Sequence, residues 1–397
     1  MSKFNISQKK VSDLQKRYEV KTNERELKNF LKSFAFLVLA LMSVYHFYAS
    51  GFGTIREILH RGIHISFVVG LVFIFYSWKK IDHSKKNFNT PLIDIILSIL
   101  VVISALYLPL LPPEVLAPRV GNPENIDIIM GSFLIVLTLE AARRSIGFTL
   151  PFICVLFILF AIFGPYFPGA LKHGGASWVG FVNHIYLTNQ GIYGIAVGVM
   201  AQYVFLFILF GVLATRIGLG QLFIDLAMVI AGKYSGGPAK VAIFSSAFLG
   251  TISGSSIANT VTTGSLTIPA MKKVGYPPHF SGAVEATAST GGQITPPILG
   301  AAAFIMVEYL EVPLRDILAA ALIPALLHYF GIFIMVHLEA KKLGLRGLTD
   351  EEVPKFLSVV KDNWLSLAPL ILLVYLILIG RTPVSYTHLR AHETVHY

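Results

Sequence analysis

Long apolar runs, each close to the length that crosses a bilayer, alternate with short polar segments along most of the chain. They cover residues 34–50, 63–78, 91–111, 126–142, 148–167, 192–214, 317–338 and 364–380. A transmembrane helix needs about 20 predominantly apolar residues. The pattern therefore predicts an all-α polytopic membrane protein.

Basic residues follow every second apolar run. Lys79 and Lys80 follow the second run, and Arg143 and Arg144 follow the fourth. Residues 1–33 are also polar and basic, and they are too long for the charged region of a signal peptide. Because cytoplasmic loops of membrane proteins carry an excess of lysine and arginine, we expect residues 1–33 to form a cytoplasmic amphipathic arm.

A polar stretch divides two short apolar runs at about residues 241–271. The stretch reads Gly250-Thr-Ile-Ser-Gly-Ser-Ser-Ile-Ala-Asn259, and Lys240 and Lys272 flank the two runs. Basic residues on both flanks place both ends in the cytoplasm. The segment is therefore predicted to be a helical hairpin that enters the membrane and turns back within it.

A second interruption lies within residues 280–309, at Thr290-Gly-Gly-Gln-Ile-Thr-Pro-Pro297. Gly291 and Gly292 can end a helix in the left-handed conformation. Thr295 can cap a new helix that has Pro296 at its first position. These signals predict one crossing that is broken near its middle.

The two interruptions carry the candidate chemistry. A broken helix exposes carbonyl groups at the end of one half and amide groups at the start of the other, and such ends bind ions in transporters. Hydroxyl and amide oxygens beside them are suitable ligands for a hard cation such as sodium. The alternative is that the small residues only allow close helix packing. The candidate binding-site residues are Ser253, Gly254, Ser255, Ser256, Asn259, Glu285, Thr290, Gly291, Gly292, Thr295 and Pro296.

Glu285 lies in the first half of the broken crossing. An ionisable residue inside a membrane is a functional candidate, and the alternative is that it caps a neighbour near the cytoplasmic interface. His46, His60 and His64 flank the outer ends of the first two apolar runs without ligand spacing, and we expect them at the interface.

Composition excludes several classes. Only 14% of residues are charged, and the net charge of +10 gathers in short segments between apolar runs, which argues against nucleic acid as a partner. Cys154 is the single cysteine, so the chain holds neither an internal disulfide nor a zinc site of cysteines. The sequence has no phosphate-binding P-loop, and we predict that the protein is not an enzyme.

The interrupted segments resemble the large membrane subunit of tripartite ATP-independent periplasmic (TRAP) transporters. The resemblance rests on residues 250–264 and 268–276 and on Ala288-Ser-Thr-Gly-Gly-Gln-Ile-Thr-Pro-Pro297. The stretch 336–347 is similar to the fused permeases of the TAXI branch. The resemblance implies a small four-helix domain (34–146) fused to an elevator-type transport domain, of which residues 147–380 are the first half.

The same resemblance implies sodium symport of an organic acid that a periplasmic binding protein of the TAXI type delivers. It places the chain in the bacterial inner membrane, with sodium as coupling ion and no other cofactor. The hairpin tip and the helix break would then form one sodium site and one wall of the substrate site. A channel, or a membrane scaffold without transport activity, remains an alternative.

The family pattern continues with a second hairpin and a second broken helix, which this sequence does not contain. We therefore expect a C-terminally truncated permease. Residues 381–397 lack an apolar period and hold three histidines, and they are expected to be a non-native tail.

Overall fold

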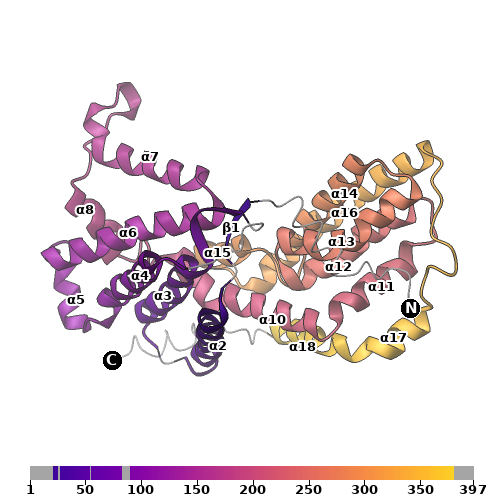
Figure 1. Ribbon diagram of the computed structural model, residues 1–397, viewed down its shortest axis with the longest axis horizontal. Coiled ribbons are helices and arrows are strands. Elements are labelled where there is room, and N and C mark those ends of the chain that lie inside the picture. Colours follow the sequence, from indigo (N-terminus) through magenta and orange to yellow (C-terminus); the bar gives the residue numbers. More distant parts are fainter. Residues whose placement is uncertain (1–20, 26, 54, 83–89, 380–397) are drawn as a thin grey trace. The chain divides into compact units, whose positions relative to one another are not determined.

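The computed structural model describes residues 21–25, 27–53, 55–82 and 90–379 (Figure 1). The expected tail 381–397 and residues 1–20 of the expected arm lie outside these ranges. Internal contacts divide the chain between Gly198 and Val199 into two compact units. Each unit is described by itself.

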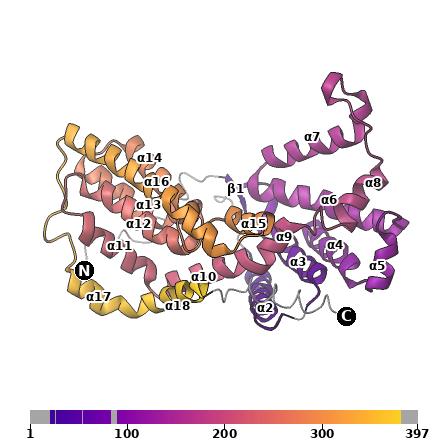
Figure 2. The same ribbon diagram turned by 180° about the vertical axis from the view of Figure 1, so that it is seen from behind.

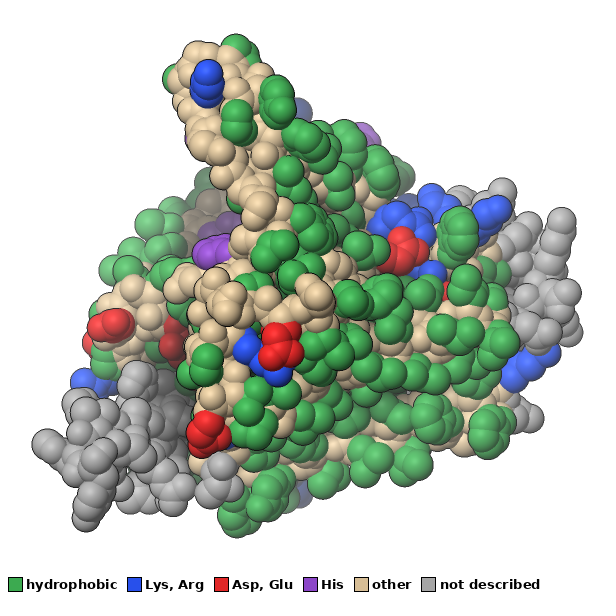
Figure 3. Space-filling view, turned by 90° about the vertical axis from the view of Figure 1, so that its left-hand side faces the viewer, with side chains coloured by type: hydrophobic (Ala, Val, Ile, Leu, Met, Phe, Trp, Pro, Cys, Tyr) green, Lys and Arg blue, Asp and Glu red, His purple; other side chains and the backbone are tan. Residues whose placement is uncertain are grey.

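The first unit is built on long apolar helices. These and their shorter neighbours are α2 (Asn29–Phe52), α3 (Glu57–Phe75), α4 (Leu92–Leu110), α5 (Pro113–Arg119), α6 (Asn125–Ile146), α7 (Thr149–Phe163), α8 (Trp178–Val182) and a π-helical turn η3 (Asn183–Leu187). Hydrophobic side chains are spread widely over the face shown in Figure 3. Such a surface is suited to lipid, as the apolar runs predict.

A short antiparallel ribbon interrupts the otherwise helical unit. Strand β1 (Lys21–Glu24) pairs with β2 (Tyr76–Asp82), with Lys21 opposite Asp82. The second apolar run was predicted to stay helical to residue 78, and the arm to last to residue 33. Both boundaries are wrong, because β1 from the arm pairs with the chain as soon as α3 ends, and α2 already begins at residue 29.

Buried ion pairs and hydrogen bonds connect this ribbon to helices α4 and α6. Arg25, directly after β1, lies 2.6 Å from Asp94 at the start of α4, and Arg144 near the end of α6 lies 2.8 Å from the same carboxylate. Arg144 also donates to the backbone oxygen of Tyr76 and to Glu140. The cluster therefore places the basic segments after α3 and in the last turn of α6 at one end of the unit, as the charge pattern predicts.

The three histidines are buried among other side chains of the unit, and their expected position at the membrane interface stays a prediction. His46, His60 and His64 are at most 6% exposed. His46 Nε2 lies 2.8 Å from His64 Nδ1, and Tyr45 hydrogen-bonds to His60. These residues join α2 to α3. Apolar runs locate the helices, but they do not show which polar side chains face a neighbouring helix.

The first unit extends well beyond the predicted domain boundary at residue 146. The segment after α8 packs into the same core, where Tyr186 donates to Ser104 O (2.7 Å) and Tyr193 donates to Ala105 O (2.9 Å). Arg61 of α3 donates to Tyr193 O. Because these contacts anchor the chain to α3 and α4, the compact unit ends at Gly198.

The second unit contains the two interrupted segments. Its elements are the end of α9 (Ile195–Val199), η4 (Met200–Val204), α10 (Phe205–Arg216), α11 (Leu219–Ala231), α12 (Gly237–Ser253), α13 (Ser256–Val274), α14 (Pro278–Thr290), η5 (Gly291–Ile294), α15 (Ala301–Leu310), α16 (Leu314–Lys342), α17 (Phe356–Asn363), η6 (Trp364–Leu367) and α18 (Ala368–Leu378). Helices α12, α13, α14 and α16 lie side by side in both views (Figures 1 and 2).

One end of this second unit is basic and is closed by residues 343–355, which we call the strap. Lys233, before α12, pairs with Asp350 at 2.6 Å, and Lys273, near the end of α13, pairs with Glu352 at 3.0 Å. The strap therefore contacts both open ends of the hairpin α12–α13. Those ends lie together at one end of the unit, which is the geometry that the flanking lysines predict.

Across the described residues, seven helices are long and apolar enough to cross a membrane, by length and composition. The chain is a mostly helical, multi-pass membrane protein.

Candidate functional site

The hairpin turns within two residues. Gly254 has a φ of +57°, a conformation that disfavours a side chain, and it ends α12. Ser255 directly precedes α13 and caps it, since its hydroxyl accepts a hydrogen bond from Ala258 N at 3.3 Å. Ser253 Oγ accepts from the Ser255 amide. Two of the predicted ligands therefore use a lone pair to close the turn.

The break after α14 differs from the prediction. Gly291 has a φ of −56° and continues into the 3₁₀ turn η5, and the second half-helix α15 begins only at Ala301, after Gly300. Thr295 and Pro296 therefore do not start it. Two consecutive prolines lack N–H groups and disfavour a helical residue before them, so the chain stays irregular from residue 295 to 300.

The glycines of the break allow close packing instead of a left-handed turn. A Cβ on Gly291 would lie 2.8 Å from the Tyr329 hydroxyl, and a Cβ on Gly292 would lie 3.1 Å from Asn259 Nδ2. A Cβ on Gly250 would lie only 2.6 Å from the Cα of Gly292. The backbone of the hairpin thus rests directly on the backbone of the break, as the packing alternative expects.

Most of the predicted residues meet at this contact. Gln293 donates to Ser256 Oγ at 3.1 Å, and a Cβ on Gly254 would lie 2.7 Å from Leu299 O. Thr290 does not take part: it is exposed, and its hydroxyl donates to Ala286 O in its own helix. The structure therefore joins the hairpin tip to the break but leaves Thr290 outside.

Asn259 has a polar side chain at the contact that is only partly satisfied by hydrogen bonds. Its side chain is buried, with 1% exposure, and its Nδ2 donates to Ser246 O at 2.9 Å. Its Oδ1 is buried and has no hydrogen-bond donor among the residues that the structure describes. An unpaired buried acceptor costs about 1–3 kcal/mol, and an amide oxygen is a suitable ligand for a hard cation.

Glu285 lies one step further into the same network and is fully buried. Its carboxylate accepts from the hydroxyls of Ser246 (3.3 Å), Ser289 (3.0 Å), Thr263 and Thr267. Its hydrogen-bond partners in the described part of the chain are hydroxyls, so they carry no charge to balance it. Both its role in the site and the alternative position near the interface stay predictions.

Sequence reasoning missed the residues that surround these two groups. They are Ser246, Thr263, Thr267, Ser289, His328 and Tyr329. One signal was present: Asn259, Thr263 and Thr267 recur every four residues and therefore share one face of α13. No comparable signal marks Tyr329, which lies in a long apolar helix.

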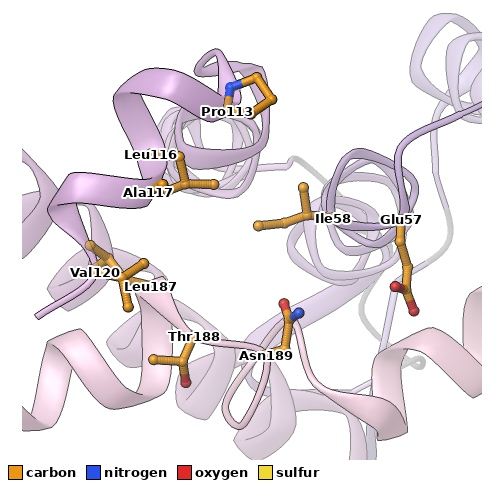
Figure 4. Close-up of a pocket in the computed structure, with 9 residues that line it drawn as sticks. All are labelled: Glu57, Ile58, Pro113, Leu116, Ala117, Val120, Leu187, Thr188 and Asn189. Atoms are coloured by element: carbon orange, nitrogen blue, oxygen red, sulfur yellow. The ribbon is translucent and has the colours of Figure 1, made fainter. Parts of the chain in front are cut away.

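A separate cavity of about 540 Å³ lies in the first unit (Figure 4). It opens between α3, α5 and the residues after η3, and Ile58, Leu116 and Leu187 are among its apolar lining. None of the predicted site residues lines it. Within the described ranges, no group of three or more histidine, cysteine or acidic side chains could hold a metal ion.

Comparison with known proteins identifies the family. Over 168 residues the chain is 29% identical to the putative TRAP transporter large permease protein of Haemophilus influenzae, an alignment that covers 42% of this chain and 39% of that protein. It is 30% identical over 174 residues to the isethionate TRAP transporter permease protein DctMQ of Oleidesulfovibrio alaskensis, covering 42% of this chain and 26% of the relative.

A third relative, the C4-dicarboxylate TRAP transporter large permease protein DctM of Pseudomonas aeruginosa, is 28% identical over 162 residues, or 40% of this chain and 37% of the relative. These proteins are named as transporter permeases and not as enzymes, and the chain spans less than half the length of each. The family model for the DctM component of the tripartite ATP-independent periplasmic transporter matches residues 133–391, which include the hairpin, the break and the strap. With 259 of 397 residues (391 − 132 = 259) inside that match, the chain belongs to the DctM family of TRAP transporter large permeases.

Proposed function

We propose that the chain is the permease component of a sodium-coupled secondary transporter in the bacterial inner membrane. It imports an organic acid that a periplasmic binding protein delivers. The observation that carries the proposal is the unpaired, buried Oδ1 of Asn259 at the contact between hairpin and break. A bound sodium ion supplies the missing electrostatic partner.

The surrounding charge supports a cation at this place. Ser246 links the two groups, because its backbone oxygen accepts from Asn259 and its hydroxyl donates to Glu285. A buried carboxylate is costly in a membrane unless a positive charge or a proton balances it. Through Ser246 the proposed cation site at Asn259 is therefore connected to the buried carboxyl group of Glu285.

The organic-acid substrate and the binding protein are proposed from the relatives. The three proteins compared above carry the TRAP transporter name, and two of them are named for isethionate and for C4-dicarboxylates. The TAXI type of the binding protein rests on residues 336–347, which include the end of α16 and the start of the strap.

We assign the fused small domain to helices α2, α3, α4 and α6, of which α3, α4 and α6 share one core. We also propose a cytoplasmic N-terminus, which is supported by the basic segments after α3 and in the last turn of α6. The lipid bilayer is then the partner of the exposed apolar surface, and nucleic acid is not a partner.

Uptake into proteoliposomes tests the proposal. The protein is expressed from its genomic locus, and uptake is measured with and without a TAXI-type binding protein, in sodium or choline. Wild-type uptake should require both sodium and the binding protein. Asn259→Leu should raise the sodium concentration for half-maximal uptake at least about tenfold, the equivalent of about 1.4 kcal/mol.

Thr290→Val is the matched control, because it removes an oxygen that is exposed and bonded to its own helix. Its sodium dependence should equal that of the wild type. Solute flux that needs neither sodium nor a binding protein would identify a channel, and the absence of any flux would identify a scaffold. Equal sodium curves for the two variants would contradict the Asn259 site.

A further inference from the structure

Helix α16 braces the helix break through two adjacent residues that the proposed cation site does not include. His328 Nε2 donates to Thr287 O, in the last turn of α14, at 3.0 Å. The Tyr329 hydroxyl lies 3.0 Å from Thr295 Oγ1, on the other side of η5. One helix therefore contacts the chain before and after the turn.

The direction of the hydrogen bonds in this brace is fixed by chemistry. Thr295 Oγ1 lies 2.7 Å from Gly291 O, and a carbonyl oxygen only accepts, so the single hydroxyl hydrogen of Thr295 points to Gly291. Tyr329 must then donate to Thr295. The result is a chain of two hydrogen bonds that runs from Tyr329 through Thr295 to the carbonyl at the start of η5.

This chain of bonds ends one residue from the proposed cation site. Gly292 follows Gly291 directly, and a Cβ on Gly292 would lie 3.1 Å from Asn259 Nδ2. A Cβ on Gly250 of the hairpin would lie 2.6 Å from the Cα of Gly292 and 3.4 Å from the Tyr329 hydroxyl. A shift of η5 away from α16 therefore changes the packing around Asn259 itself.

We propose that Tyr329 is a positioning residue that sets the cation affinity of the Asn259 site by holding η5 against the hairpin. It does so through Thr295, without contacting the cation. The inference rests on the proposed function, since it needs a cation at Asn259. A site held within a fraction of an ångström binds more tightly than one that must first be ordered.

Sodium-dependent thermal stabilisation of the purified chain tests this directly. A ligand that binds only the folded state raises its stability in proportion to ln(1 + [L]/Kd), so a sodium titration in choline chloride at constant ionic strength yields an apparent Kd. Tyr329→Phe removes one oxygen and keeps the ring. Loss of one hydrogen bond should weaken sodium binding by about three- to tenfold.

Four further variants separate positioning from general stability. Thr295→Val should weaken sodium binding as much as Tyr329→Phe, and the double variant should be no weaker, because both changes break the same chain of bonds. Thr295→Ser keeps the hydroxyl and should bind sodium like the wild type. Tyr375→Phe, at a position that is 59% exposed in α18, is the matched control and should change nothing.

If Tyr329 only stabilised the fold, Tyr329→Phe would lower the melting temperature measured without sodium. Positioning predicts that Tyr329→Phe shifts the sodium midpoint far more than the sodium-free melting temperature. If Tyr329→Phe lowers the sodium-free melting temperature but leaves the sodium midpoint unchanged, the inference about Tyr329 fails and the proposed function stands. The same holds if the sodium titration of Tyr329→Phe equals that of the wild type. If the wild type shows no sodium-specific stabilisation, both this inference and the proposed function fail.

Discussion

Replacing Gly250 by alanine tests whether the hairpin and the break touch through their backbones. The new Cβ would lie 2.6 Å from the Cα of Gly292, whereas carbon atoms normally pack about 3.5–4.0 Å apart. The two backbones must therefore separate by about 1 Å. Overpacking of this kind costs about 1–3 kcal/mol.

A matched substitution isolates this steric cost. Gly282 lies inside α14, and a Cβ there meets nothing within 4 Å. Alanine is favoured over glycine inside a helix by about 1 kcal/mol, so Gly282→Ala should be neutral or stabilising. Because both substitutions gain this helical term, the difference between them reports the overpacking of about 1–3 kcal/mol.

Thermal unfolding in detergent measures the difference. For a unit of this size, about 1 kcal/mol shifts the melting temperature by about 2–4 °C, so Gly250→Ala should melt several degrees below Gly282→Ala. Gly250→Ala should also show a smaller increase in melting temperature on sodium addition. If the two variants melt together, the backbone contact between hairpin and break is not tight, and the reasoning about Asn259 loses its geometric basis.

Three further outcomes follow from the structure. Asp94→Asn removes the buried partner of Arg25 and Arg144, so it should destabilise the first unit by about 3–5 kcal/mol in thermal unfolding, whereas a charge change at the partly exposed Glu140 should cost at most about 1 kcal/mol. Hydrogen bonds from the Thr349 amide and then from Lys273 hold the pKa of Glu352 below its usual value. This stabilisation is present above the unfolded pKa of about 4.3 and is lost as pH falls through the lower folded pKa, so hydrogen exchange in the strap should increase in that range and Glu352→Gln should abolish the change. A cysteine at Lys273, in a Cys154→Ala background, should react with an impermeant reagent only from the cytoplasmic side, and labelling from the periplasm would contradict the orientation of the hairpin.

Local signals predicted the helices well, because the length of an apolar run is a property of the sequence alone. Helix α4 (Leu92–Leu110) matches the run at 91–111 almost residue for residue, and the hairpin helices α12 and α13 begin and end near the expected positions. The predicted helix ends are wrong where contact with a segment distant in sequence determines the end. The end of α3 depends on the pairing of β2 with β1, and nothing in residues 63–78 encodes that partner.

The same distinction explains the break. Gly291 and Gly292 were predicted to end a helix by their own conformational freedom, but their φ values stay out of the left-handed region. They are small because Tyr329, Asn259 and Gly250 approach them from three other helices. Close approach is a property of the tertiary structure, so a single sequence cannot distinguish it from a helix-ending glycine.

The candidate ligands also divide by where they lie along a helix. A polar residue at a turn already has a task, since the backbone there lacks partners; Ser255 caps α13 and Ser253 accepts from the next turn residue. A polar residue in the middle of a helix has no such task, because the helix satisfies its own backbone. Asn259 and Glu285 lie within α13 and α14, and the Thr263 hydroxyl lies close to both the Asn259 carbonyl and the carboxyl group of Glu285. Polar residues repeated every four positions along one helix face are therefore a stronger indication of an ion site than serine or threonine at a break, and in this chain the repeat begins at Asn259, whose buried oxygen has no hydrogen-bond partner among the described residues.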